Sequence, residues 1–141
     1  MANNILTPLN LWDDFNSLLP LKETTLKRET IQNAVFNYVY FSGRQVGNER
    51  VRIYGIYAEQ KNSKAGTIII VPSVDEPLDA DLVLYFSNCG FNVLAVDLYG
   101  KCDNCTDFTV YPQAINYANY VESGRTFDFV DNTAKETCWY E

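Results

Sequence analysis

The sequence predicts an α/β fold: a mixed sheet with an antiparallel front pair of strands and one right-handed parallel βαβ unit. Two observations lead to this prediction. Aromatic and β-branched residues crowd into 34–42 and alternate with polar residues in 51–57, which is typical of paired strands. Farther along, a β-branched run at 67–71 and an apolar run at 92–96 flank a segment long enough for a crossover helix.

The N-terminal quarter is predicted to be a helix followed by a connector. Thr7-Pro8 is a helix-start signal, and Pro20 ends the pattern. Between them the apolar side chains fall on one helical face: Leu11, Trp12, Phe15, Leu18 and Leu19. Residues 22–33 are polar and rich in threonine. We therefore divide the chain into an N-terminal helix and connector, 1–33, and a partial domain, 34–141.

Turn signals separate the two front strands. Ser42-Gly43 and Gly47-Asn48 are both candidate turns, and Val51, Ile53 and Tyr57 alternate with Arg50, Arg52 and Tyr54. Gly55 lies inside the second strand, where a glycine suggests a bulge or a close backbone approach. Residues 60–66 are expected to form a loop.

A helix is predicted between the two apolar runs. Pro77 opens it, Asp79 and Asp81 lie near its positive N-terminus, and Gly90 supplies a left-handed cap. Its apolar face is expected to consist of Leu78, Leu82, Tyr85, Phe86 and Cys89. Because 67–71 is apolar throughout, both faces of that strand are expected to be buried.

After the strand at 92–96, we expect a polar turn at 101–107 and a mixed aromatic tract at 108–120. Asn132 or Thr133 can cap a helix that runs to Glu141 and carries Trp139 and Tyr140 near its end. A natural terminus seldom exposes such large side chains. We therefore expect these residues to be the front portion of a longer protein.

The composition narrows the range of functions. The 141 residues match one domain, and 47% hydrophobic content is ample for a core. A net charge of −7 repels phosphate backbones and anionic lipid, so we expect neither a nucleic-acid nor a membrane partner. The acidic residues are scattered, so no metal is expected. The first residues lack a signal peptide, and we expect a cytoplasmic protein without a cofactor.

Two further groups of residues are candidate binding or redox sites. Cys102-Asp103-Asn104-Cys105 is a CxxC motif, but one pair falls short of a zinc set, and Asp-Asn favours a turn over a redox helix. We interpret it as a loop pair that oxidises in air. The aromatic residues Tyr111, Tyr117, Tyr120 and Phe127 offer a sugar-stacking surface, but packing in the core is the favoured reading.

Residues 90–100 read Gly-Phe-Asn-Val-Leu-Ala-Val-Asp-Leu-Tyr-Gly. This phrase, with the order of elements across 49–101, resembles the opening of the α/β-hydrolase fold, closest to acetyl xylan esterases and dienelactone hydrolase-like esterases. The family phrase has arginine where this chain has Tyr99. The resemblance implies that the loop after the first apolar strand supplies oxyanion-hole amides, for which the backbone N–H groups of Ser73 and Val74 are the candidates. It also implies that Asp97 is a structural strand-end acid.

No catalytic residue is expected in this chain. It contains no histidine and no Gly-x-Ser-x-Gly, so a Ser-His-Asp triad cannot be completed within it. The leading hypothesis is the N-terminal portion of an esterase-like hydrolase that is inactive alone and has the rest of that hydrolase as its partner. The alternative is a non-catalytic binding or assembly domain. The strand at 67–71 would lack a neighbour, and we expect self-association through its edge.

Overall fold

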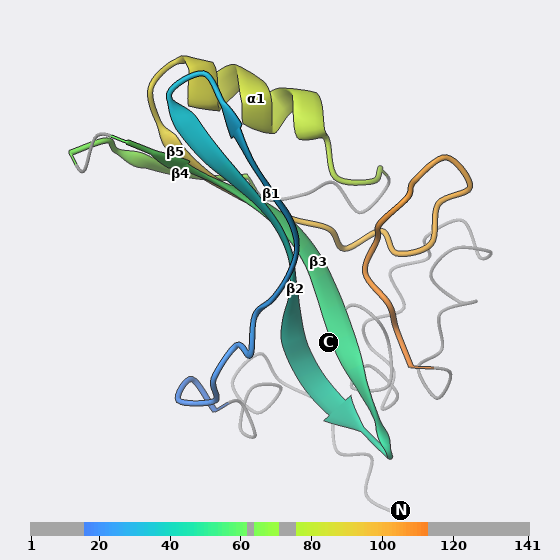
Figure 1. Ribbon diagram of the computed structural model, residues 1–141. Helices are drawn as coiled ribbons and strands as arrows, with labels where there is room; N and C mark the ends of the chain where they lie inside the picture. The colour runs from blue at the N-terminus through green and yellow to red at the C-terminus, as the bar shows by residue number, and fades with distance from the viewer. Residues whose placement is uncertain (1–15, 62–63, 71–75, 113–141) are drawn as a thin grey trace, which may run out of the picture.

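The computed structural model describes residues 16–61, 64–70 and 76–112, which form one mixed sheet and one helix (Figure 1). The order across the sheet is β1-β2-β3-β5-β4. β1, β2 and β3 are successively antiparallel, β3 is antiparallel to β5, and β5 is parallel to β4. The elements are β1 (Thr24–Ile31), β2 (Ala34–Val46), β3 (Glu49–Gln60), β4 (Thr67–Ile70), α1 (Ala80–Asn88) and β5 (Asn92–Val96). The predicted combination of an antiparallel pair with a parallel strand-helix-strand unit is confirmed.

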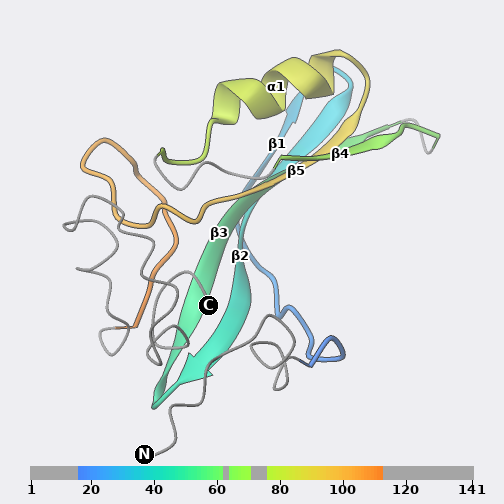
Figure 2. The ribbon, with the colours of Figure 1, turned by 180° about the vertical axis from the view of Figure 1, so that it is seen from behind.

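The front pair of strands is longer than predicted. β2 and β3 continue as a hairpin beyond the end of α1, as both views show (Figures 1 and 2). The turn lies at Gly47, whose φ of +58° favours glycine, whereas Gly43 remains within β2. A Cβ on Gly43 would lie 2.9 Å from the Cβ of Val51, so this glycine permits close approach of the two strands.

The expected connector was wrong for residues 24–31, which form β1 and pair antiparallel with β2. β1 is polar and mostly exposed, so its sequence lacks the alternating apolar residues that would indicate a strand. It is held by the backbone ladder and by Glu29, whose carboxylate accepts a hydrogen bond from the Tyr38 hydroxyl at 2.7 Å. Lys27 forms an ion pair with Glu29 at 2.8 Å.

The predicted N-terminal helix falls largely outside the described residues. Its last part is described, and there residues 16–19 form a turn with Leu18 89% exposed, so the helix prediction was wrong for this end. The tail from 113 to 141, with its expected capped helix, also lies outside the described residues.

The C-terminal end of α1 agrees with the sequence, whereas the helix begins at Ala80, three residues after the predicted start at Pro77. Asp79 is the N-cap, and its side chain accepts hydrogen bonds from the backbone N–H groups of Asp81 at 2.9 Å and Leu82 at 3.0 Å. Gly90 has a φ of +91°, and its N–H donates to the carbonyl of Ser87 at 2.9 Å. A polar cap and a left-handed glycine therefore set the length of the helix.

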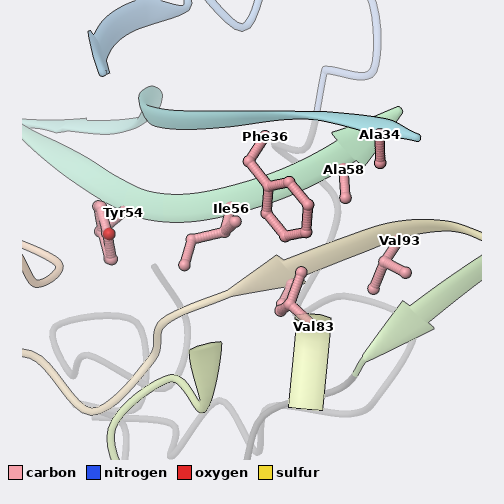
Figure 3. Packing of buried hydrophobic residues seen from close by; sticks show 8 residues of the cluster. Ala34, Phe36, Tyr54, Ile56, Ala58, Val83 and Val93 are labelled. Carbon is pink, nitrogen blue, oxygen red and sulfur yellow. The ribbon is translucent and has the colours of Figure 1, made fainter. Parts of the chain in front are cut away.

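The predicted apolar face of α1 was right for Leu78 and Phe86, which are partly buried against the core, and wrong for its other members. The buried positions are Val83 and Ser87, whereas Leu82, Tyr85 and Cys89 are exposed. Figure 3 shows Val83 projecting from α1 toward Phe36 and Ile56 of the sheet. Val83 and Ser87 are four residues apart, and their small side chains let the helix lie close to the strands.

The core lies between α1 and one face of the sheet. It is built from inward-facing residues of β2, β3, α1 and β5: Ala34, Phe36, Tyr54, Ile56, Ala58, Val83, Val93 and Ala95 (Figure 3). The other face is less covered within the described residues. Ile69 of β4 is 67% exposed, so the expected burial of both faces of this strand was wrong. Among the described strands β4 lies at the edge of the sheet, whereas α1 packs on β3 and β5.

Gly55 allows close approach between β3 and β5. A Cβ at this position would lie 3.0 Å from the backbone oxygen of Ala95 and 3.1 Å from the ring of Phe41. The ladder passes through Gly55 without a shift, with Val39 opposite it on one side and Val96 on the other. Of the two roles considered for this glycine, the structure supports close approach and not a bulge.

Candidate functional site

The candidate site lies where β5 ends and the chain turns back toward β3. In α/β sheets, ligand sites form preferentially at the carboxyl ends of the parallel strands. Asp97 directly follows β5 and is 1% exposed. Its carboxylate accepts backbone hydrogen bonds from Thr109 at 2.7 Å, Tyr99 at 3.1 Å and Gly100 at 3.2 Å. This arrangement makes Asp97 an anchor for the loop that follows.

Thr109 joins the same loop to β3. Its hydroxyl donates to the carbonyl of Asp97 and accepts from the backbone N–H of Tyr54 at 2.9 Å. The N–H of Asp97 in turn donates to the carbonyl of Tyr54 at 2.8 Å. One residue farther along, Arg52 and Val110 exchange backbone hydrogen bonds of 3.0 and 2.9 Å. The segment after β5, orange in Figure 1, is therefore fixed at both ends.

A cavity of about 250 Å³ lies beside this loop, between β3, the approach to α1 and the loop itself. Its apolar wall includes Ile56, Leu78 and Phe108, and its polar wall includes Tyr54 and Asp107. Tyr54 is 8% exposed. Burial, reinforced by the charge of Asp107, raises the pKa of Tyr54 well above its usual range. The phenol is therefore neutral at physiological pH.

The CxxC motif lies in the same loop and adopts the expected turn. The backbone N–H of Cys105 donates to the carbonyl of Cys102 at 3.2 Å, and both thiols are free. Burial, followed by the hydrogen bond with Cys102, raises the pKa of the Cys105 thiol to about 11. A protonated thiol is a weak nucleophile. Nowhere in the described parts of the chain do three His, Cys, Asp or Glu side chains group as a metal site would require.

The other sequence candidates are only partly placed. Ser73 and Val74, the oxyanion-hole candidates, lie outside the described residues, as do Tyr117, Tyr120 and Phe127. Tyr111 is described, and its hydroxyl donates to the carbonyl of Leu98 at 2.9 Å. This contact helps to hold the loop against the end of β5.

Sequence reasoning missed Tyr54, Asp107 and Thr109. Tyr54 was grouped with the arginines on the polar side of β3, but α1 and the loop cover that side and bury the ring. Asp107 lies at the end of the predicted polar turn and Thr109 at the start of the predicted aromatic tract. Their roles depend on how the loop folds back, which brings Thr109 into contact with Asp97, twelve residues earlier. No local sequence pattern predicts such a contact.

A broader hollow of about 640 Å³ lies on the sheet face opposite α1. Val35, Phe41, Tyr57 and Leu94 contribute to its floor. Of these, Tyr57 uses its hydroxyl to donate to Glu23 at 2.9 Å. As far as the described residues show, the hollow is mainly an uncovered sheet surface, and the side chains that line it form no group suited to catalysis.

Comparison of the chain with protein-family profiles, with curated proteins and with solved structures found no match. Within the described ranges, no helix combines the length and apolar character needed to cross a membrane.

Proposed function

We propose that this chain forms the opening half of an esterase-type α/β-hydrolase sheet and that the nucleophile and the histidine lie on polypeptide outside these 141 residues. The observation that carries the proposal is the strand order β2-β3-β5-β4, in which only β3 runs against its neighbours and α1 links the two parallel strands. α/β-Hydrolase sheets open with this arrangement. The resemblance of 90–100 to the family phrase falls on the matching strand, β5, and the turn after it.

The chemistry of the strand ends agrees with this proposal. In α/β-hydrolases, one oxyanion-hole N–H comes from the loop between the third strand and the first helix. The equivalent loop here joins β4 to α1 and contains Ser73 and Val74. Asp97 occupies the end of β5, and three backbone N–H groups hold its carboxylate, as suits an anchor and not a proton acceptor. The chain supplies a platform and one part of an oxyanion hole.

The edge of the sheet supports the same reading. In an α/β-hydrolase, the strand that leads to the nucleophile pairs beside the strand equivalent to β4. Here β4 is the outermost of the described strands, and Ile69 projects from it with 67% of its surface exposed. We propose that the nucleophile-bearing strand occupies this edge in the whole protein and that a second copy of the chain occupies it when the chain is alone.

Serine-directed labelling tests the proposed function. The recombinant chain is incubated with a fluorophosphonate probe and with p-nitrophenyl acetate, beside a heat-denatured control. An antibody raised against the chain then captures the native protein from the cells that express it, and the captured material receives the same probe. We expect no labelling and no turnover above the control for the chain, and a labelled serine in the captured protein.

Two results would count against the proposal. Phosphonate-sensitive turnover by the chain alone would mean that the 141 residues contain their own nucleophile. If neither the captured native protein nor any protein captured with it is labelled, the result would favour the alternative of a non-catalytic binding or assembly domain.

A further inference from the structure

We propose that the cavity beside Tyr54 binds a small organic ammonium ion, which sits between the Asp107 carboxylate and the Tyr54 hydroxyl. This binding site is independent of any hydrolase triad. The described residues that line it come from β2, β3, the approach to α1 and the loop after β5, and none of them belongs to β4.

The first argument is unmet hydrogen bonding in the cavity wall. The Tyr54 hydroxyl makes no hydrogen bond to any described residue, although the side chain is 8% exposed. Buried hydroxyls nearly always have a partner because leaving one unpaired costs free energy. Asp107 is half-buried, and its carboxylate likewise makes no hydrogen bond or ion pair within the described part of the chain.

The neighbouring polar groups of the wall are already satisfied. The Asp97 carboxylate accepts three backbone N–H groups, and the Tyr38 hydroxyl donates to Glu29 at 2.7 Å. Apart from the exposed Thr106, the polar groups of the wall left to hold a ligand are the buried Tyr54 and the half-buried Asp107. Both side chains line the same cavity of about 250 Å³, which places them within reach of one small ligand.

The second argument is the sign of the charge. No lysine or arginine lines the cavity among the described residues, whereas Asp107 contributes a negative charge. The N-terminus of α1 adjoins the cavity but is already capped by the Asp79 carboxylate, so it does not offer free N–H groups to an anion. A cation is therefore the ligand that this wall favours.

The third argument is the nature of the walls. Ile56, Leu78 and Phe108 are apolar, and the rings of Tyr38 and Phe108 offer aromatic surface to a cation. A metal ion needs several oxygen or sulfur ligands, and the described residues contain no such group. An ammonium ion with a short apolar body uses both kinds of wall, donating to Asp107 and Tyr54 while its body replaces water against the apolar side.

Three probes of similar size and different charge test this proposal on the full chain: 2-phenylethylamine, 2-phenylethanol and phenylacetate. Binding is measured by calorimetry and by saturation-transfer NMR at neutral pH. We expect saturable binding of the amine, with the neutral and the anionic probes at least about tenfold weaker. Asp107→Asn is expected to weaken the amine at least about tenfold, which equals about 1.4 kcal/mol.

Two further variants separate binding from structure. Tyr54→Phe removes an unpaired hydroxyl, so we expect weaker amine binding while the urea midpoint stays equal or rises. Asp103→Asn removes one negative charge from the same loop at an exposed position that does not line the cavity, and we expect unchanged binding.

The proposal is overturned if the amine shows no saturable binding, if phenylacetate binds as tightly as the amine, or if Asp103→Asn weakens binding as much as Asp107→Asn. It is equally overturned if Tyr54→Phe leaves amine affinity unchanged. The comparison of the three probes on the unmodified chain decides the question of charge even if Asp107→Asn fails to fold.

Discussion

The buried carboxylate of Asp97 accepts a 2.7 Å hydrogen bond from the backbone N–H of Thr109, twelve residues later in the chain. Together with the bonds from Tyr99 and Gly100, this contact lets one side chain shape the loop after β5. A buried carboxylate with three N–H donors is a strong structural element because each bond is charge-assisted.

Replacing Asp97 by asparagine should therefore destabilise the fold by about 2 kcal/mol or more, since the charge is lost and an amide NH₂ faces backbone donors. Urea unfolding followed by circular dichroism measures the change. The control is Asp103→Asn, an exposed acid of the same loop, for which we expect a change within about 0.5 kcal/mol. Equal midpoints for Asp97→Asn and the native chain would show that the anchor contributes nothing.

Gly55→Ala should destabilise the sheet by about 1–3 kcal/mol because the added methyl group would meet the Ala95 backbone oxygen at 3.0 Å. Thermal and urea unfolding give the measurement. Gly66→Ala is the matched control: its Cβ would meet only the Phe91 ring at 3.6 Å, which is ordinary contact. If the two variants unfold alike, β3 and β5 are not as close at Gly55 as the structure indicates.

Stability should fall as the pH rises from about 10 to about 12. Burial, followed by the hydrogen bond to Glu29, raises the pKa of Tyr38 from 10.0 to about 12. The unfolded chain therefore releases this proton first, so its contribution to stability is complete below pH 10 and is lost as the pH passes the folded pKa. Urea midpoints across this range should fall less steeply for Tyr38→Phe than for the native chain. Tyr85→Phe, at an exposed position, should behave as the native chain does.

Self-association through β4 should depend on Ile69. Lysine at this exposed edge position places a charge where a second strand would pair, so Ile69→Lys should raise the dissociation constant at least about tenfold. Analytical ultracentrifugation over a range of concentrations measures it. Tyr85→Lys introduces the same charge on exposed α1 and should have no effect. A native chain that stays monomeric at every concentration would contradict this prediction.

The parts of the fold that local patterns encode were predictable. Crowded aromatic and β-branched residues identified β2, alternation identified β3, and Pro77, the acids Asp79 and Asp81, and the Gly90 cap identified α1. β1 was missed because a polar edge strand, held by its backbone and by Lys27, Glu29 and Tyr38, carries no apolar period. The buried face of α1 was predicted only in part: Phe86 packs against the core as expected, but the fully buried positions are the smaller Val83 and Ser87.

The site was less predictable than the fold. Asp97 could be placed at a strand end because the strand before it is plainly apolar. The cavity could not be predicted, since it requires Tyr54, Leu78 and Asp107 to meet from three distant parts of the chain. These contacts depend on tertiary packing, which the periodicity of apolar residues and turn propensities do not predict.

The double backbone contact between Arg52 and Val110 has a consequence for how this protein tolerates change. The loop that follows β5 is held to β3 at both ends. Tyr54 of β3 binds its beginning at Asp97, and Arg52, two residues away on the same strand, binds its end at Val110. Extra residues inserted at the exposed tip near Asp103-Asn104 would lengthen the loop without displacing either of its anchored ends. This tip is thus a natural place for a new recognition element to be acquired while the scaffold beneath keeps its shape.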